Sequence, residues 1–252
     1  GDVYKRQGIW ILFYNRHLFY VHRRDFWLFI GSGMIGMTAL SVFYNISVTK
    51  GSLALSAVLL AMSPVFVLFL AAIFFHEPVT RHKLTCVTLA LIGCVLVSGV
   101  LESNGLSWSI TGILCGILAS FFYAVYGIIS KKVTQKGYHF LTITFYGTLF
   151  SGMTMLPFSN IHSLSSMIVS GQRTTFFILI IHALVSSVLP YALYSLSMRY
   201  MEAGKASILA SSEPAAAMLF GAVLYAETPG ILSICGLCFT ITAVILLNYE
   251  RN

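Results

Sequence analysis

The chain has 252 residues, of which 58% are hydrophobic and only 9% are charged. Soluble domains carry roughly 25% charged residues, so this composition excludes a water-soluble fold. The formal net charge of +7 would suit nucleic acid, but the basic residues are scattered in the gaps between apolar runs. We therefore expect no nucleic-acid partner. The composition instead indicates that the chain is embedded in a lipid bilayer.

Apolar runs long enough to cross the hydrocarbon as helices, about 20 residues each, follow one another along the chain. Residues 1–7 are polar and are interpreted as a non-native or disordered leader, and the apolar run 8–21 is too short to cross. Backbone groups in lipid must bond one another, and the alternation of a barrel is lacking, so an all-α integral membrane protein is expected. The sequence predicts eight full spans, at residues 26–47, 52–75, 84–101, 107–130, 138–157, 174–198, 204–226 and 230–249.

Lys and Arg residues between the spans fall mostly on one side of the predicted bundle. The other side has only Lys50 and Arg173. Because cytoplasmic loops carry an excess of Lys and Arg, the basic side and the C-terminus are predicted to be cytoplasmic, in a multi-pass protein of the cell membrane. The basic side holds Arg16, Arg23, Arg24, Arg81, Lys83, Lys131, Lys132, Lys136, Arg199, Lys205 and Arg251.

Two stretches 150 positions apart share one pattern. In the first, Pro64 interrupts an apolar, helix-length run and Glu77 follows thirteen residues later; in the second, Pro214 and Glu227 stand at the same places. An odd number of crossings separates the two copies, so they are predicted to insert in opposite directions. Inverted repeats with breaks at matching points are typical of carriers that work by alternating access.

These motifs resemble the EamA repeat of the drug/metabolite transporter superfamily. In the first copy the resemblance rests on the run from Ala57 to Pro64, on Glu77 and on the helix around Gly93; in the second it rests on Ser212-Glu213-Pro214, Gly221 and Glu227. It covers about residues 8–250 and implies two inverted repeats of five transmembrane helices with a substrate cavity between them. The first repeat, 8–101, would be incomplete and the second would be 107–250. The resemblance also makes Glu77 and Glu227 repeat signatures with a structural role.

Glu213 is a carboxylate near the middle of the seventh predicted span. A charged side chain at the bilayer centre costs roughly 2.5–3.5 kcal/mol on insertion scales, so it should be paired, protonated or in contact with water. With Ser211 and Ser212 it is predicted to bind a substrate amino group or a proton. The alternative is a protonated Glu213 that joins two helices by hydrogen bonds. The adjacent Pro214 predicts a kink.

His182 is the only histidine deep in a predicted span. At 1.5 Å per residue its depth differs from that of Glu213 by about 4–5 Å, so the two side chains could pair. A role in helix packing is equally compatible with the sequence. Pro190 marks a second break in the same span, and Pro64 is predicted to be a hinge or kink.

Four tyrosines leave two interpretations open. Tyr44 and Tyr194 stand 150 positions apart, each near a helix end, where an interfacial anchor is favoured over a cavity aromatic. Tyr123 and Tyr126 are open to the same two interpretations.

The expected function is secondary-active transport of a small polar metabolite, not an enzymatic reaction. All five cysteines lie in apolar runs, where packing is the favoured role, and neither a metal-site pattern nor a cofactor motif is found. No Lys or Arg lies in the interior of a span, which favours amino acids or other neutral, zwitterionic or cationic solutes over anions. The alternative is a non-transporting membrane protein, such as a lipid-modifying enzyme, a scaffold or a sensor. Whether the protein forms a homodimer is not predicted by the sequence.

Overall fold

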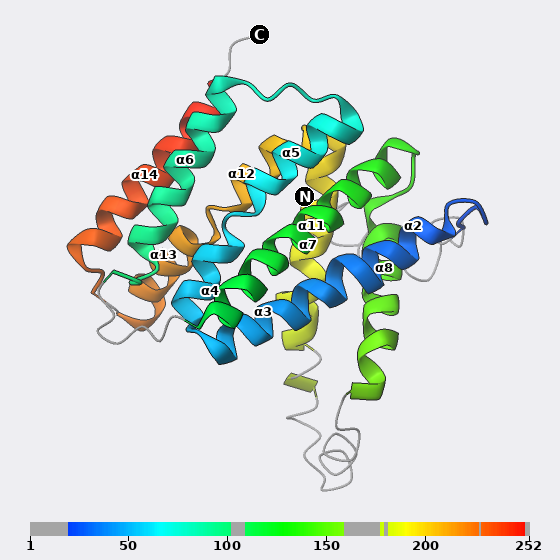
Figure 1. Cartoon of the computed structure of the whole chain (residues 1–252), viewed down its shortest axis with the longest axis horizontal. Coiled ribbons are helices and arrows are strands. Elements are labelled where there is room, and N and C mark those ends of the chain that lie inside the picture. Colours follow the sequence, from blue (N-terminus) through cyan, green and yellow to red (C-terminus); the bar gives the residue numbers. More distant parts are fainter. Residues whose placement is uncertain (1–19, 102–108, 159–176, 179–180, 227, 250–252) are drawn as a thin grey trace, which may run out of the picture.

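The structure is a computed structural model and describes residues 20–101, 109–158, 177–178, 181–226 and 228–249. The described residues are helical and form no strand. Figure 1 shows the labelled helices as a bundle. Their bounds are α2 Phe26–Ile30, η2 Gly31–Thr38, α3 Ala39–Lys50, α4 Leu53–Leu60, α5 Ser63–Phe75, α6 Arg81–Val97, α7 Ile110–Gln135, α8 Phe140–Met155, η3 Leu156–Phe158, η4 Leu184–Val188, α11 Leu189–Tyr200, α12 Ala203–Ala210, α13 Glu213–Tyr225 and α14 Ile231–Asn248.

Within the described residues, six helical stretches are long and apolar enough to cross a membrane. The prediction of an all-α, multi-pass membrane protein is confirmed. Two of the eight predicted spans, however, correspond to α6 and α8, which have only 17 and 16 residues. Helices of that length lie at the lower limit of the about 17–25 residues that cross the hydrocarbon core, so these two spans stay predictions. The six stretches are Phe26–Lys50, Leu53–Phe75, Ile110–Gln135, Ile181–Tyr200, Ala203–Tyr225 and Ile231–Asn248.

Large apolar side chains cover the outside of these helices. Phe69 and Phe220 are each 64% exposed, and Val223 is 80% exposed. In water such a surface would drive association. In a bilayer it is the surface that contacts the lipid tails.

Two of the long stretches are interrupted at a proline. α5 begins one residue before Pro64, and α13 begins one residue before Pro214. Proline has no backbone N–H, and its ring clashes with the carbonyl four residues earlier, so a continuous helix through it is disfavoured. In the first turn of a new helix, the missing N–H breaks no intrahelical bond. Each stretch therefore consists of two shorter helices that meet near mid-span.

The bounds of the helices recur 150 positions apart. α12 and α13 start and end 150 residues after α4 and α5, and α11 is related in the same way to α3. The π-helical segments η2 and η4 end at Thr38 and Val188, the same distance apart. Even the left-handed residues that follow α5 and α13 correspond, at His76 (φ 55°) and Ala226 (φ 53°). The offset in the sequence is therefore also an offset in backbone structure.

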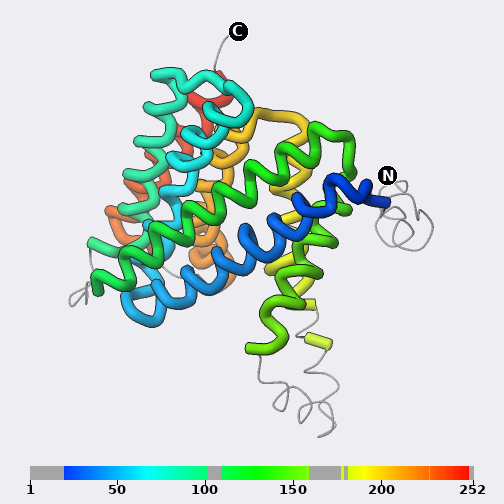
Figure 2. The backbone as a smooth tube through the Cα atoms, turned by 45° about the vertical axis from the view of Figure 1, so that its right-hand side comes forward, coloured from blue at the N-terminus to red at the C-terminus, as the bar shows by residue number. Residues whose placement is uncertain are grey.

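The bundle has two chemically different ends. One end, called here the basic end, comprises residues 75–83, 131–139 and 198–205. There the His82 ring lies 2.8 Å from the carbonyl of Leu246, which joins the start of α6 to the end of α14. The opposite end, called here the second end, comprises residues 50–54, 97–98 and 228–233. Figure 2 shows α6 and α14 side by side along one flank, and α3 running along α7.

The most extensive helix contact among the described residues is between α6 and α14. A Cβ atom added to Gly93 would lie 2.8 Å from the carbonyl oxygen of Gly236 and 2.3 Å from the Thr240 hydroxyl. Small residues let helix backbones approach in this way, which is the usual means of packing helices in a membrane. The resulting pair lies beside the interrupted helices and forms one wall of the cavity between them.

Candidate functional site

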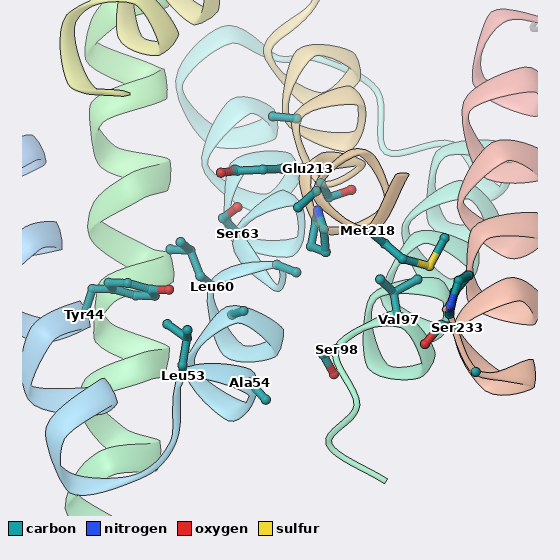
Figure 3. A pocket seen from close by; sticks show the side chains of 18 of the residues that line it. Tyr44, Leu53, Ala54, Leu60, Ser63, Val97, Ser98, Glu213, Met218 and Ser233 are labelled. Carbon is teal, nitrogen blue, oxygen red and sulfur yellow. The ribbon is translucent and has the colours of Figure 1, made fainter. Parts of the chain in front are cut away.

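A cavity of about 850 Å³ lies between the interrupted helices, and both halves of the chain line it. Figure 3 shows Glu213 and Ser63 near one end of it and Leu53, Ala54 and Ser98 towards the other. The lining reaches the second end but includes no described residue of the basic end. It consists of Tyr44, Leu53, Ala54, Ala57, Leu60, Ala61, Ser63, Val97, Ser98, Tyr123, Ala210, Ser211, Glu213, Pro214, Ala217, Met218, Thr228, Pro229, Gly230 and Ser233.

Glu213 supplies the carboxylate of this cavity. It is the first residue of α13, so the free backbone N–H groups of that helix start lie beside it and favour a negative charge. Its side chain is exposed to the cavity. Within the described part of the chain it has neither a hydrogen bond nor an ion pair. In this conformation Glu213 therefore does not join two helices by hydrogen bonds, which was the alternative interpretation. The carboxylate is free to meet a solute.

The two serines before Glu213 have different positions. Ser211 lines the cavity, although its hydroxyl donates to the carbonyl of Ile208 at 2.7 Å. The Ser212 hydroxyl donates to Leu209 at 2.7 Å, and Ser212 is not part of the lining. Ser212 thus lies outside the lining in this conformation, and its role as a ligand stays a prediction.

Further polar groups come from positions that the sequence did not single out as ligands. Ser63 occupies the place in α5 that Glu213 has in α13, and it lines the cavity together with Ser98 and Ser233. A hydroxyl both donates and accepts hydrogen bonds, so these groups suit a neutral or zwitterionic solute. The cavity thus combines one carboxylate with several hydroxyls on an otherwise apolar surface.

The four tyrosines fall into two pairs. Tyr44 and Tyr123 line the cavity, and Figure 3 shows the Tyr44 ring pointing into it. Tyr126 is fully buried and its hydroxyl lies 2.9 Å from that of Ser195, while the Tyr194 ring packs behind Tyr123 at 5.2 Å between centroids. Tyr126 and Tyr194 are neither cavity aromatics nor interfacial anchors, because the packing of α7 against α11 encloses them.

His182 does not join the site. Its side chain is exposed and it is absent from the lining, so this conformation does not bring it to Glu213 and the pairing stays a prediction. Tyr191, nine positions further along the chain, packs towards the core. That is about two and a half α-helical turns, or slightly fewer through η4, so the two side chains point in different directions. Pro190 is the second residue of α11, the helix that follows η4 directly.

Glu77 is a cap, not a lining residue. Its carboxylate accepts hydrogen bonds from the backbone N–H groups of Ala203 at 3.1 Å and Gly204 at 3.4 Å. These are free donors at the start of α12, where a negative charge is also favoured by the helix dipole. Glu227, its counterpart in the sequence, lies outside the described residues.

The basic end is held by charged side chains that the sequence interpretation treated only as orientation signals. Lys83 donates to the carbonyl of Pro78 at 2.9 Å and to Glu202 at 2.5 Å. Lys131 of α7 donates to the carbonyls of Met198 at 3.0 Å and Met201 at 2.6 Å, at the end of α11. The bond from Lys83 to Glu202 connects the two halves of the chain, and the bonds from Lys131 connect α7 to α11 within the second half, all at the end where the cavity is closed.

A second charged cluster joins α2 to the turn between α7 and α8. Asp25 accepts hydrogen bonds from Lys136 and from the Tyr138 hydroxyl, the latter at 2.8 Å. The bond from Lys136 and then that from Tyr138 lower the pKa of the Asp25 carboxyl below its ordinary value. The described residues contain no group of His, Cys, Asp and Glu side chains placed to hold a metal ion.

Comparison with known proteins decides the family. The model of the EamA-like transporter family matches residues 8–99 and 110–249. The chain belongs to the EamA-like transporter family. Three relatives are uncharacterized transporters. Two come from Archaeoglobus fulgidus, one 24% identical (87% of this chain, 76% of the relative) and one 27% identical (81% and 70%). YdfC of Bacillus subtilis is 22% identical, over 86% of this chain and 71% of its own.

The fold also has a counterpart among solved structures. A chain titled only "Crystal structure of protein" superposes with a TM-score of 0.72 at 12% sequence identity, over 93% of this EamA-like chain and 81% of the other. At that identity the likeness concerns the fold alone. This EamA-like protein is therefore a membrane transporter by family, with a cavity at the place where its two interrupted helices break.

Proposed function

We propose that this protein is a secondary-active transporter that moves small polar metabolites across the cytoplasmic membrane by alternating access. Its solutes are amino acids or similar neutral, zwitterionic or cationic molecules. The observation that carries this proposal is the unpaired Glu213 carboxylate, exposed in a cavity at the mid-span break between α12 and α13. An ionisable group at such a depth is a functional candidate by default.

The chemistry of the cavity supports the choice of solute. Among the described lining residues Glu213 is the only Asp or Glu, and the lining includes no Lys, Arg or His to balance it. An ammonium group is therefore attracted, whereas an anion would find no cationic partner in a medium of low dielectric constant. The hydroxyls of Tyr44, Ser63 and Ser233 can bond the polar part of a neutral or zwitterionic solute.

The repeated backbone supports the mechanism. α4–α5 and α12–α13 match at an offset of 150, and the Glu77 cap joins the end of α5 to the start of α12. The two interrupted stretches thus run in opposite directions, as inverted repeats of five helices each would require. Two oppositely oriented copies of one unit can form two conformations that open to opposite faces. Here the cavity reaches the second end, and the charge bias predicts that this end is the outer face.

The test is counterflow in proteoliposomes with a panel of labelled amino acids and related amines. Glu213→Gln is expected to lower flux on the order of tenfold or more, or to make it independent of a proton gradient, while the protein still inserts. Glu213→Asp should keep part of the activity because the charge is retained. Ser212→Ala is the matched control next to the site. Unchanged, proton-dependent flux in Glu213→Gln would remove Glu213 from the mechanism and leave the proposal without its main support.

A further inference from the structure

The basic end contains an ion pair with a buried member. The Lys83 side chain is only 2% exposed, and its ammonium group is held by the carbonyl of Pro78 and the carboxylate of Glu202, which is 40% exposed. The pair joins the start of α6 to the residue before α12, so it spans the two halves of the chain. A buried ammonium group that lost its carboxylate would be left in a poorly solvating environment, which is strongly unfavourable.

The repeat makes it possible to compare the two ends position by position. Residue 233 corresponds to Lys83 and residue 52 to Glu202, and both are serines. Ser52 caps α4 by accepting the backbone N–H of Leu55 at 3.1 Å, and Ser233 lines the cavity. The second end therefore carries hydroxyls where the basic end carries the ion pair. The sequence repeats Glu77 at position 227, but it repeats neither charge of the pair.

We propose that the Lys83–Glu202 pair is a one-sided latch, which makes the conformation closed at the basic end and open at the second end the resting state. This inference rests on the proposed alternating access. Opening the basic end would separate α6 from α12 and remove the partner of Lys83. Opening the second end separates only Ser52 from Ser233, whose hydroxyls can bond water instead. The two conformations thus differ by the free energy of this ion pair, and that difference biases their populations.

The latch is tested by the accessibility of the cavity, which requires no solute. Ala54 lines the cavity at the second end. In a chain whose five cysteines are replaced, Ala54→Cys reports the second-end-open conformation through its rate of reaction with a charged maleimide. Lipid nanodiscs leave both ends accessible to the reagent. Lys83→Met, which keeps an unbranched apolar chain and removes the charge, is expected to slow the reaction on the order of tenfold.

Two further variants separate the latch from a general effect on the fold. Arg81→Gln removes an exposed positive charge two positions earlier and is expected to leave the rate unchanged. Glu202→Lys should slow the reaction, and the exchange Lys83→Glu with Glu202→Lys should restore it, because the pair is re-formed with reversed signs. If Lys83→Met does not fold, the comparison of Glu202→Lys with the charge-exchanged double variant is sufficient to test the latch. An unchanged or faster rate in a folded Lys83→Met, or in Glu202→Lys, would overturn the latch.

The failure of the latch differs from the failure of the proposed function. If flux depends on Glu213 but the labelling rate is the same with and without Lys83, the latch is refuted and the proposed transport function stands. A labelling rate that responds to Lys83 and Glu202, in a protein that catalyses no flux of the solute panel, would do the reverse.

Discussion

The Glu77 carboxylate accepts the backbone N–H of Ala203 at 3.1 Å, although 126 positions separate the two residues. Glu77 follows the left-handed residue that ends α5, and Ala203 begins α12, so the bond ties the end of one interrupted stretch to the start of the other. A residue that the sequence marked as a repeat signature is thus the cap of a helix in the other half of the chain.

Removing this cap is expected to destabilise the protein. Glu77→Ala leaves two N–H groups at the start of α12 without their acceptor, and lost N-caps cost about 0.5–2 kcal/mol. Thermal unfolding in detergent should show the loss as a lower melting temperature. Glu77→Gln keeps an acceptor oxygen and should lie between Ala and the wild type. Equal melting temperatures for the three proteins would contradict this role of Glu77.

The stability of the basic end is expected to depend on pH through His139. Its ring nitrogen Nδ1 accepts the backbone N–H of Leu141 at 3.3 Å and caps α8, which requires the neutral form. Burial, and then the charge of Arg199, lower the pKa of His139 below its ordinary value of 6.5. The folded state therefore binds this proton less readily than the unfolded state.

The stabilisation from His139 is accordingly complete above the unfolded pKa and is lost as pH falls through the lower folded pKa. The melting temperature of the wild type should fall on acidification from about pH 7.5 to about pH 5. His139→Asn keeps a capping oxygen that does not titrate. Over the same pH range its melting temperature should therefore fall by a few degrees less than that of the wild type. Parallel curves for the two proteins would show that His139 does not contribute.

The contact between α6 and α14 is expected to tolerate no side chain at position 93. In Gly93→Ala the new Cβ would meet the carbonyl oxygen of Gly236 at 2.8 Å, a backbone atom that no rotamer change can move. Overpacking of this kind costs typically 1–3 kcal/mol. Gly152→Ala is the matched control, since nothing lies within 4 Å of its added Cβ. That control should be neutral or slightly stabilising in the same unfolding assay.

Two adjacent alanines of α13 should respond differently to enlargement. Ala217 lines the cavity, whereas Ala216 is exposed outside it. Ala217→Leu fills space that a solute needs and is expected to reduce counterflow several-fold with little effect on stability. Ala216→Leu adds the same volume to an apolar outer surface and should leave flux near the wild-type level. Equal flux in both variants would show that solutes do not pass this part of the cavity.

Local sequence features are sufficient to predict that the chain is surrounded by lipid, which segments are helical and where the helices are interrupted. The helix breaks lie at Pro64 and Pro214 because the missing N–H acts within one turn of its own chain. Glu213 could be found in the same way, since a carboxylate in an apolar run is conspicuous wherever its helix packs. The match to the EamA-like family agrees with this part of the prediction.

The remaining assignments required knowledge of which way each helix faces. His182 is a candidate by its depth and Tyr194 by its position in the repeat, yet His182 is exposed and Tyr194 lies in the core. Nothing in the sequence pairs Lys83 with Glu202, because the two are 119 positions apart and belong to different halves.

The order of the residues is enough to predict that this chain is embedded in lipid, which segments are helical, where the helices break and that they repeat. Which side chains share the cavity, and which close the basic end, depends on how the helices pack. Spans in a bilayer are apolar on all sides, so no polar face reveals how each helix is rotated about its axis. That rotation is set by close packing between helices, as at Gly93, and such contacts join residues that are distant in the chain.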